Sequence, residues 1–245
     1  KLERERFYYH ADRLGMLIWQ DMVSGGSLPS DWQTQQKPTL FPRSWTSIDD
    51  SRPAAWVKLA AGDRAYREEW TATVHEAVLR LSAYPSIVTW VLFNESWGQF
   101  SVGEATRMVR ALDPTRPILS VSGWYDQGTG DYMGIHNYFR PQRIWRDAAA
   151  RPRAFMISEF GGLTWHIPEH SSFPKPYGYA DFTSIGAWRA ALSKLLSDTR
   201  ALERDGLSGY VYTQVSDIEE ETNGLMSYDR RIIKLETDPI GESGS

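Results

Sequence analysis

Short apolar runs rich in β-branched residues alternate along this chain with stretches that carry apolar residues at helical spacing. The apolar runs predict strands at Met16–Trp19, Ile87–Phe93, Ile118–Val121, Tyr132–His136, Ala154–Ile157 and Gly209–Thr213. The helical spacing predicts helices over residues 2–14, 64–82, 101–112 and 184–205. Continuously apolar strands that alternate with helices are typical of a parallel sheet covered on both faces.

Helix-end signals agree with this division. Ser101 and Glu104 have the spacing of a capping box at the start of a helix, and Asp113 followed by Pro114 ends the same helix. Gly206 stands where a C-cap glycine belongs after the 184–205 stretch. The helices are therefore expected to lie within the connections between strands.

Polar residues follow several of the predicted strands at the point where each strand ends. They are Gln20-Asp21, Asn94-Glu95, Asn137-Tyr138, Glu159 and Gln214. Polar groups that converge from the carboxyl ends of parallel strands form the catalytic face of a (β/α)8 barrel. A doubly wound dinucleotide-binding sheet would instead carry a glycine-rich turn after its first strand, and this sequence has none there. The predicted fold class is therefore α/β, a (β/α)8 TIM barrel.

The number of elements falls short of a complete barrel. Six strand–helix units can be found, not eight, and the chain opens inside a predicted helix. Two stretches, 23–63 and 160–183, are rich in Pro, Ser, Gly and Trp and predict extended loops, which at this length are usually functional. We expect residues 1–235 to form one partial barrel domain and residues 236–245 to form a C-terminal tail or the start of a linker.

Composition narrows the classes of partner. The 245 residues suffice for one large domain with a substantial core. The net charge of −4, with its signs well mixed, argues against nucleic acid or an acidic membrane surface, and no apolar run is long enough to span a bilayer. The absence of cysteine excludes disulfides, thiolate zinc sites and a cysteine nucleophile. The compartment, cytoplasmic or exported, stays open.

The chain is rich in aromatic residues, with 11 Trp, 12 Tyr and 9 Phe. Packing is the default use of aromatic side chains. Trp124 and Trp165, however, each stand in a loop after a predicted strand, and aromatic faces in clefts stack well on the C–H faces of sugars. Sugar stacking and core packing both remain open for these two residues.

Two glutamates each close an apolar strand. Glu95 follows "TWVLFN", and Glu159 follows "AFMIS". In a barrel both would lie at the rim of one pocket, where a pair of carboxylates is the machinery of a retaining glycosidase. The alternative is that each is an ordinary rim carboxylate or begins a solvated loop. The acidic run from Asp217 to Glu221 is interpreted as a solvated loop in preference to a cation site.

Four segments resemble glycoside hydrolase family 2, in the order in which that family carries them. "YPSIVTWVLFNESWG" is similar to the acid/base segment of the family, and "FMISEFGG" to its nucleophile strand. "YYHADRLGMLIWQDM" is similar to the passage from helix 2 to strand 3, and "GYVYTQVSD" to the eighth strand. Each segment alone is moderately specific, whereas the set runs from near the start of the chain to near its end.

The resemblance implies a retaining exo-β-glycosidase that hydrolyses terminal β-linked sugars of the galactoside, mannoside or glucuronide class, with no cofactor and no metal. It implies that Glu95 is the general acid/base and Glu159 the nucleophile. It further implies that Asn94 hydrogen-bonds the sugar 2-OH and that Tyr138 hydrogen-bonds the nucleophile. An endo-acting β-glycanase of the same clan and a non-catalytic carbohydrate-binding barrel are the alternatives.

Four further positions are candidates for contact with the sugar. Gln20 and Asp21 stand where the family carries a polar pair after strand 3, and "WQDM" is closest to the β-mannosidase branch. His136 is a candidate for lining the site, with an ordinary strand-end histidine as the alternative. Gln214 departs from the family, in which this neighbourhood often carries Trp, so the substrate cannot be assigned by analogy.

The resemblance also accounts for the missing units. In the family, two barrel strands and one or more β-sandwich domains precede the segment that residues 1–15 match, and an arginine expected near the end of the second strand is absent with them. We expect strands 3–8 to be present, and strands 3 and 8 to be open edges prone to aggregation. A carbohydrate is the expected ligand, and the oligomeric state, a homo-oligomer included, is left open.

Overall fold

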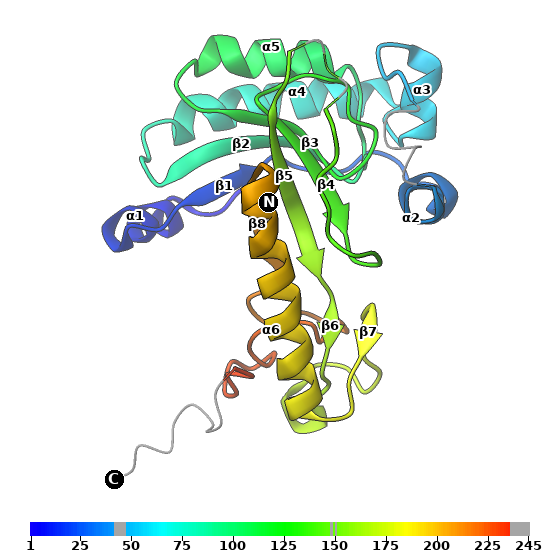
Figure 1. The fold of residues 1–245 in the computed structure, drawn as a ribbon. Coiled ribbons are helices and arrows are strands. Elements are labelled where there is room, and N and C mark those ends of the chain that lie inside the picture. The colour runs from blue at the N-terminus through cyan, green and yellow to red at the C-terminus, as the bar shows by residue number, and fades with distance from the viewer. Residues whose placement is uncertain (42–47, 148, 150, 236–245) are drawn as a thin grey trace. The chain divides into compact units, whose positions relative to one another are not determined.

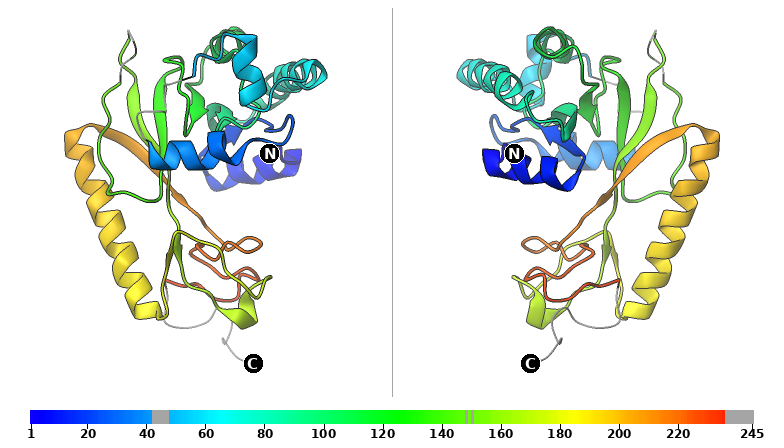
Figure 2. Two further views of the ribbon diagram at one scale, coloured as in Figure 1. Left: turned by 90° about the vertical axis from the view of Figure 1, so that its right-hand side faces the viewer. Right: turned by 90° about the vertical axis from the view of Figure 1, so that its left-hand side faces the viewer.

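The computed structural model describes residues 1–41, 48–147, 149 and 151–235. The described residues form two compact units (Figures 1 and 2). The first unit comprises residues 1–135 and 146–156, and the second comprises residues 136–145 and the chain from 157 onwards. Among the described residues no helix is both long enough and apolar enough to cross a membrane.

The described strands form one six-stranded parallel sheet and a separate pair. The larger sheet has the order β1 (Ile18–Asp21), β2 (Ile87–Asn94), β3 (Ile118–Ser122), β4 (Tyr132–Asn137), β5 (Ala154–Gly161) and β8 (Leu207–Thr213). Strands β4 and β5 run from the first unit into the second. All six predicted strands are therefore present. The first five extend past their predicted carboxyl ends, β1 starts two residues later than predicted, and β8 starts two residues earlier.

The first unit is built around an aromatic and aliphatic core. Helices α4 (Arg64–Leu81) and α5 (Val102–Leu112) lie side by side, and α5 packs on β2 and β3 (Figure 1). Trp70 of α4 stacks on Phe93 of β2, with ring centroids 4.5 Å apart and planes at 8°. Phe100 closes the same cluster edge-on against both rings. Helix α1 (Glu5–Leu14) ends at Gly15, whose φ of 66° suits a glycine C-cap.

The long connection after β1 contains helices that the sequence analysis predicted as extended loop. They are the π-helix η1 (Trp32–Gln36), α2 (Lys37–Leu40) and α3 (Pro53–Lys58). Pro38 and Pro53 stand in the first turns of α2 and α3, where proline needs no donor and its fixed φ favours the helix. Of the prolines counted as loop signals, Pro53 therefore begins a helix, and Pro38 is the second residue of α2, which follows η1 directly. Residues 42–47 lie outside the described part of the chain.

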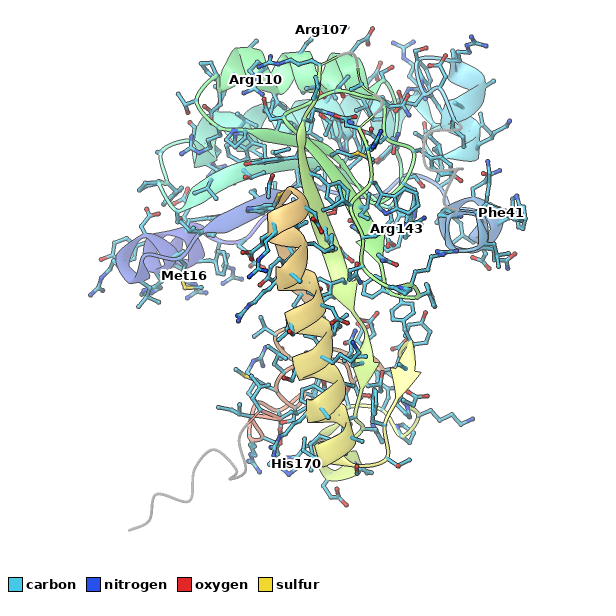
Figure 3. All side chains as sticks on the ribbon, in the orientation of Figure 1. Met16, Phe41, Arg107, Arg110, Arg143 and His170 are labelled. Atoms are coloured by element: carbon cyan, nitrogen blue, oxygen red, sulfur yellow. The ribbon has the colours of Figure 1, made fainter. Side chains whose placement is uncertain are left out.

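The second unit combines one long helix with short elements. Helix α6 (Ile185–Ala201) begins at Ser184, whose hydroxyl accepts a hydrogen bond from Ala187 N. It continues as the 3-10 helix η4 (Leu202–Asp205) and ends at Gly206, as predicted. Strands β6 (Leu163–Thr164) and β7 (Ala180–Asp181) form the separate pair, and the 3-10 helix η3 (Pro168–His170) lies between them in sequence. Figure 3 labels His170 at the end of η3, where its ring contacts the Asp229 carboxylate at 2.8 Å.

The predicted capping box at the start of α5 is wrong. Ser101 has a left-handed φ of 41° and makes no side-chain capping bond. The carboxylate of Asp50 caps the helix instead, because it accepts from Val102 N at 3.3 and 3.4 Å. A residue 51 positions earlier than Ser101 thus supplies the cap. The predicted domain limit at 235 stays a prediction, since the tail 236–245 lies outside the described residues.

Candidate active site

The end of β2 carries Asn94 and Glu95. Asn94 is the last residue of the strand and Glu95 the first after it, and both are half-buried. Glu95 N donates to Ser122 O at the end of β3 at 2.9 Å, so the neighbouring strand fixes the backbone of the glutamate. Glu95 and Ser96 have φ values of 47° and 64°, a left-handed conformation that costs free energy in any residue except glycine.

The end of β5 carries Glu159 among groups that can donate to it. Tyr138 Oη donates to Glu159 Oε2 at 2.5 Å, and His136 Nδ1 lies 3.4 Å from the same oxygen. His136 is buried, with 1% of its surface exposed, whereas the Glu159 side chain is 28% exposed. A hydroxyl donor stabilises the ionised form of a carboxylate and fixes its direction. The predicted partner Tyr138 is therefore hydrogen-bonded to Glu159, and His136, which was predicted only as a candidate for lining the site, lies beside the same carboxylate.

Tyr179, which the sequence analysis did not single out, packs against Tyr138, the hydrogen-bond donor to this carboxylate. Its ring stacks on the ring of Tyr138 with centroids 4.4 Å apart and planes at 9°. Tyr179 N donates to Gly162 O at 3.0 Å, just after β5. Gly162 has a φ of 69°, and a Cβ there would come within 2.2 Å of Tyr179 Cδ2. The "FGG" that follows Glu159 is the sequence signal for this close approach.

Gln214 follows β8 and is held in a polar network. Its Nε2 donates to Glu221 Oε2 at 2.8 Å and to Asn223 Oδ1 at 2.9 Å. These contacts fix the direction of the Gln214 side chain at the carboxyl end of its strand.

The interpretation of residues 217–221 as a solvated loop is wrong for its first member. Asp217 is buried, and its Oδ1 accepts from Lys234 Nζ at 2.7 Å and from Gly224 N at 2.9 Å. Lys234 is also fully buried and donates to Thr222 O at 2.9 Å. Burial raises the pKa of Asp217 and lowers that of Lys234, and their ion pair opposes both shifts. The sequence analysis missed this pair because lysine is rarely buried.

The other predicted residues lie in varied surroundings. Gln20 is buried, accepts from Tyr8 Oη at 2.6 Å and donates to Lys1 O at 2.9 Å, so its amide ties the start of the chain to β1. Asp21 is the exposed last residue of β1. Trp124 is buried after β3, which favours packing. Trp165 is half-buried after β6, and its N donates to Thr222 O at 3.2 Å.

The family model for the TIM barrel domain of glycosyl hydrolases family 2 matches residues 3–142. The match spans more than half of the chain, and the chain therefore belongs to glycosyl hydrolase family 2. The resemblance inferred from the four sequence segments is confirmed. The predicted fold class is confirmed as well, since the described residues supply six parallel strands of an α/β barrel and not eight.

The chain is also similar in sequence to curated proteins and in fold to solved structures. Beta-mannosidase of Bos taurus is 25% identical over 218 residues, which cover 74% of this chain and 21% of the bovine protein. The chain thus spans about a fifth of the length of the curated relatives that it matches. A GH2 beta-galacturonidase from Eisenbergiella tayi bound to galacturonate has a TM-score of 0.63 at 15% identity, covering 96% of this chain and 42% of the other. A beta-glucuronidase of Ruminococcus gnavus has a TM-score of 0.50 at 14% identity, covering 92% and 40%.

Proposed function

We propose that this chain supplies the two catalytic glutamates of a retaining exo-β-glycosidase. Glu159 is the nucleophile and Glu95 the general acid/base. The observation that carries the proposal is the surroundings of Glu159, whose Oε2 accepts a 2.5 Å hydrogen bond from Tyr138 and lies 3.4 Å from His136. An ionised carboxylate with a fixed oxygen at the carboxyl end of a barrel strand is what nucleophilic attack on a sugar requires.

Hydrolysis then takes two steps. Glu159 attacks the anomeric carbon while Glu95 protonates the departing glycosidic oxygen, which forms a covalent glycosyl-enzyme. Glu95 next removes a proton from water, the water attacks the same carbon, and Glu159 leaves as a carboxylate. Asn94, beside the acid/base, is proposed to hydrogen-bond the sugar 2-OH, a contact that tightens in the transition state.

A panel of aryl β-glycosides, tested with the full-length protein and its Glu159→Gln variant, checks this function. We expect turnover of at least one member and none by the variant. Glu169→Gln, which changes an exposed glutamate of η3 in the same unit, should retain full activity. Normal activity in Glu159→Gln would refute the assignment, and sugar binding without hydrolysis of any member would favour a carbohydrate-binding module.

Two further measurements separate retaining from inverting and exo from endo action. NMR of the first anomer released should show the β-anomer, because two displacements restore the starting configuration. An exo enzyme should release single sugars from the end of an oligosaccharide, whereas an endo-acting glycanase would release oligosaccharides.

The sugar is proposed only as a class. The resemblance of "WQDM" to the β-mannosidase branch and the identity with bovine beta-mannosidase favour a mannoside. The beta-galacturonidase and beta-glucuronidase likenesses concern the fold, so β-galactosides and β-uronides belong in the panel as well.

A further inference from the structure

The loop that carries Glu95 is strained. We define the acid/base loop as residues 95–101, between β2 and α5. Within this loop, which lies wholly in the described chain, Glu95, Ser96 and Ser101 have positive φ values of 47°, 64° and 41°. Non-glycine residues keep such a conformation only where surrounding contacts hold them. Something outside the loop must therefore fix it.

Asp50 provides the main external contacts at the far end of the loop. Its Oδ2 accepts from Gln99 Nε2 at 2.9 Å, and its backbone O accepts from Ser101 N at 3.1 Å. Its carboxylate also accepts from Val102 N at 3.3 and 3.4 Å, the capping contact described above. Because the side chain and the backbone carbonyl of Asp50 together hold Gln99, Ser101 and Val102, the loop cannot relax at this end without breaking these contacts.

Asp50 is itself firmly held. It is 2% exposed. Its N donates to Gln127 Oε1 at 3.2 Å, and its O accepts from Trp56 Nε1 at 2.7 Å. Gln99 Nε2 donates in addition to Tyr125 O at 2.9 Å, in the segment that follows β3. The acid/base loop is thus joined through Asp50 to the connection after β1 and to the segment after β3.

We propose that Asp50 is a positioning residue for Glu95, an inference that rests on the proposed acid/base role of Glu95. By holding Gln99, Ser101 and Val102, Asp50 keeps the strained backbone of the loop in place and so keeps the Glu95 carboxyl within proton-transfer distance of the leaving oxygen. Proton transfer needs the two heavy atoms within about 2.6–3.2 Å, so a small relaxation of the loop suffices to weaken it. In this proposal the buried Asp50 acts through the loop and not by contact with the substrate.

The dependence of the rate on the leaving group tests this role. Dinitrophenol is acidic enough to leave as its phenolate without receiving a proton, whereas unsubstituted phenol needs a proton from the general acid to leave. Asp50→Asn keeps the shape of the side chain but replaces one acceptor oxygen with an NH2 group. This group would face another donor, Gln99 Nε2 or Val102 N. In the full-length protein we expect Asp50→Asn to lower kcat/KM by a factor that is roughly ten or more times larger on the phenyl glycoside than on the dinitrophenyl glycoside. This ratio is part of the ~10²–10⁴-fold rate acceleration that general acids supply.

Two further variants distinguish a positioning role of Asp50 from a general folding defect. Gln99→Met removes the amide that Asp50 Oδ2 accepts from but leaves the contact with Val102 N, and it should produce the same leaving-group dependence to a smaller extent. Asp49→Asn changes the neighbouring carboxylate, whose side chain is 54% exposed, and should alter neither rate. Equal losses on the two substrates in Asp50→Asn and Gln99→Met would overturn the proposal.

Glu95→Gln separates failure of this inference from failure of the proposed function. If Glu95 is the acid/base, Glu95→Gln shows the strongest leaving-group dependence of the series. If Glu95→Gln shows it and both loop variants do not, the role of Asp50 is refuted alone. If Glu95→Gln loses nothing, or loses equally on both substrates, the acid/base assignment falls and the Asp50 proposal falls with it.

Discussion

The two units bury apolar and polar side chains in different proportions, because buried apolar side chains outnumber buried polar ones in the described residues of the first unit but not in those of the second. In the first unit the core cluster is apolar, with Trp70, Trp90 and Phe93 almost fully buried. Among the described residues of the second unit, the buried apolar side chains are Ile157, Phe160, Trp188, Leu192 and Leu207. These apolar side chains are outnumbered by the buried polar side chains of the same unit, which are His136, Asn137, Ser158, Thr164, Thr199, Asp217, Thr222, Asn223, Ser227 and Lys234.

This difference predicts two kinds of sensitivity to mutation. An apolar core loses transfer and packing energy in proportion to the volume removed. When one member of a buried polar network is removed, its partner stays buried without a hydrogen bond or a counter-ion. The protein is then destabilised by the full desolvation free energy of that partner. The apolar core of the first unit should therefore tolerate conservative changes, whereas the buried polar network of the second unit should be sensitive to the loss of single contacts.

The largest effect is expected from Lys234→Met. This change leaves the Asp217 carboxylate buried without its cation, and we expect the free energy of unfolding to fall by about 3–5 kcal/mol. Urea denaturation measures the loss. Lys194→Met removes an exposed pair with Asp198 and should cost no more than about 0.5 kcal/mol. Equal effects of the two variants would contradict the importance of the buried pair, and adding Asp217→Asn to Lys234→Met should recover part of the stability.

Gly162→Ala should have the next largest effect. The added Cβ would collide with the ring of Tyr179, and the φ of 69° disfavours alanine, so we expect a loss of about 2 kcal/mol. Activity should fall as well, because Tyr179 would leave its stack on Tyr138. Gly186→Ala is the matched control, since a Cβ at this position of α6 meets nothing within 4 Å and its stability should change by at most about 1 kcal/mol. Full activity in Gly162→Ala would show that Tyr179 does not position Glu159 through Tyr138.

Asp50 gives the first unit one polar feature with a defined pH dependence. Burial raises the pKa of its carboxyl from 3.8 to about 6, although hydrogen bonds from Gln99 and Val102 oppose the shift. The folded protein thus holds this proton more tightly than the unfolded chain does, and the stability gained from it is full below pH 3.8 and lost as the pH rises through about 6.

The stability difference between wild type and Asp50→Asn measures this linkage. Between pH 4 and pH 7 the free energy of unfolding of the wild type should fall, relative to that of Asp50→Asn, by on the order of 2 kcal/mol, since one unit of pKa corresponds to about 1.4 kcal/mol. Denaturation of both proteins at several pH values checks the prediction. A difference that does not depend on pH would mean that the Asp50 carboxyl titrates as in the unfolded chain.

Phe93→Leu should have the smallest effect of the series. It removes the parallel stack on Trp70 but keeps an apolar side chain of similar volume, so we expect a loss of about 1–2 kcal/mol. Thermal or urea unfolding gives the value. A loss as large as that of Lys234→Met would mean that the apolar core is as intolerant as the polar network.

The sequence predicted the elements whose pattern is local. The continuous apolar run of β2 located that strand to within one residue at its carboxyl end, and the helical spacing of α4 did the same for that helix. The two glutamates were found because each follows such a strand. The four family segments then suggested the partner of Glu159, and Tyr138 is indeed hydrogen-bonded to it.

The features that were missed depend on residues far apart in the chain. Asp50 caps α5 from the connection after β1, so the local Ser101–Glu104 spacing suggested a wrong cap. Lys234 is buried only because Asp217 and Thr222 meet its ammonium group. Tyr179 stands in a stretch that has neither strand nor helix periodicity, and only the stack on Tyr138 distinguishes it. No propensity or spacing rule encodes contacts of this kind.

The connection after β1 is held near both of its ends, which has a consequence for the design of chimaeric proteins. Trp70 Nε1 donates to Val23 O at 3.0 Å where the connection leaves β1, and Asp50 holds it at the other side. Between these two points the chain is also held where Ser27 N donates to Ala60 O at 2.9 Å and Gln33 O accepts from Tyr125 Oη at 2.8 Å. A chimaera that takes this connection from another family member would therefore have to keep Val23 and Asp50 and also restore the contacts that Ser27 and Gln33 make.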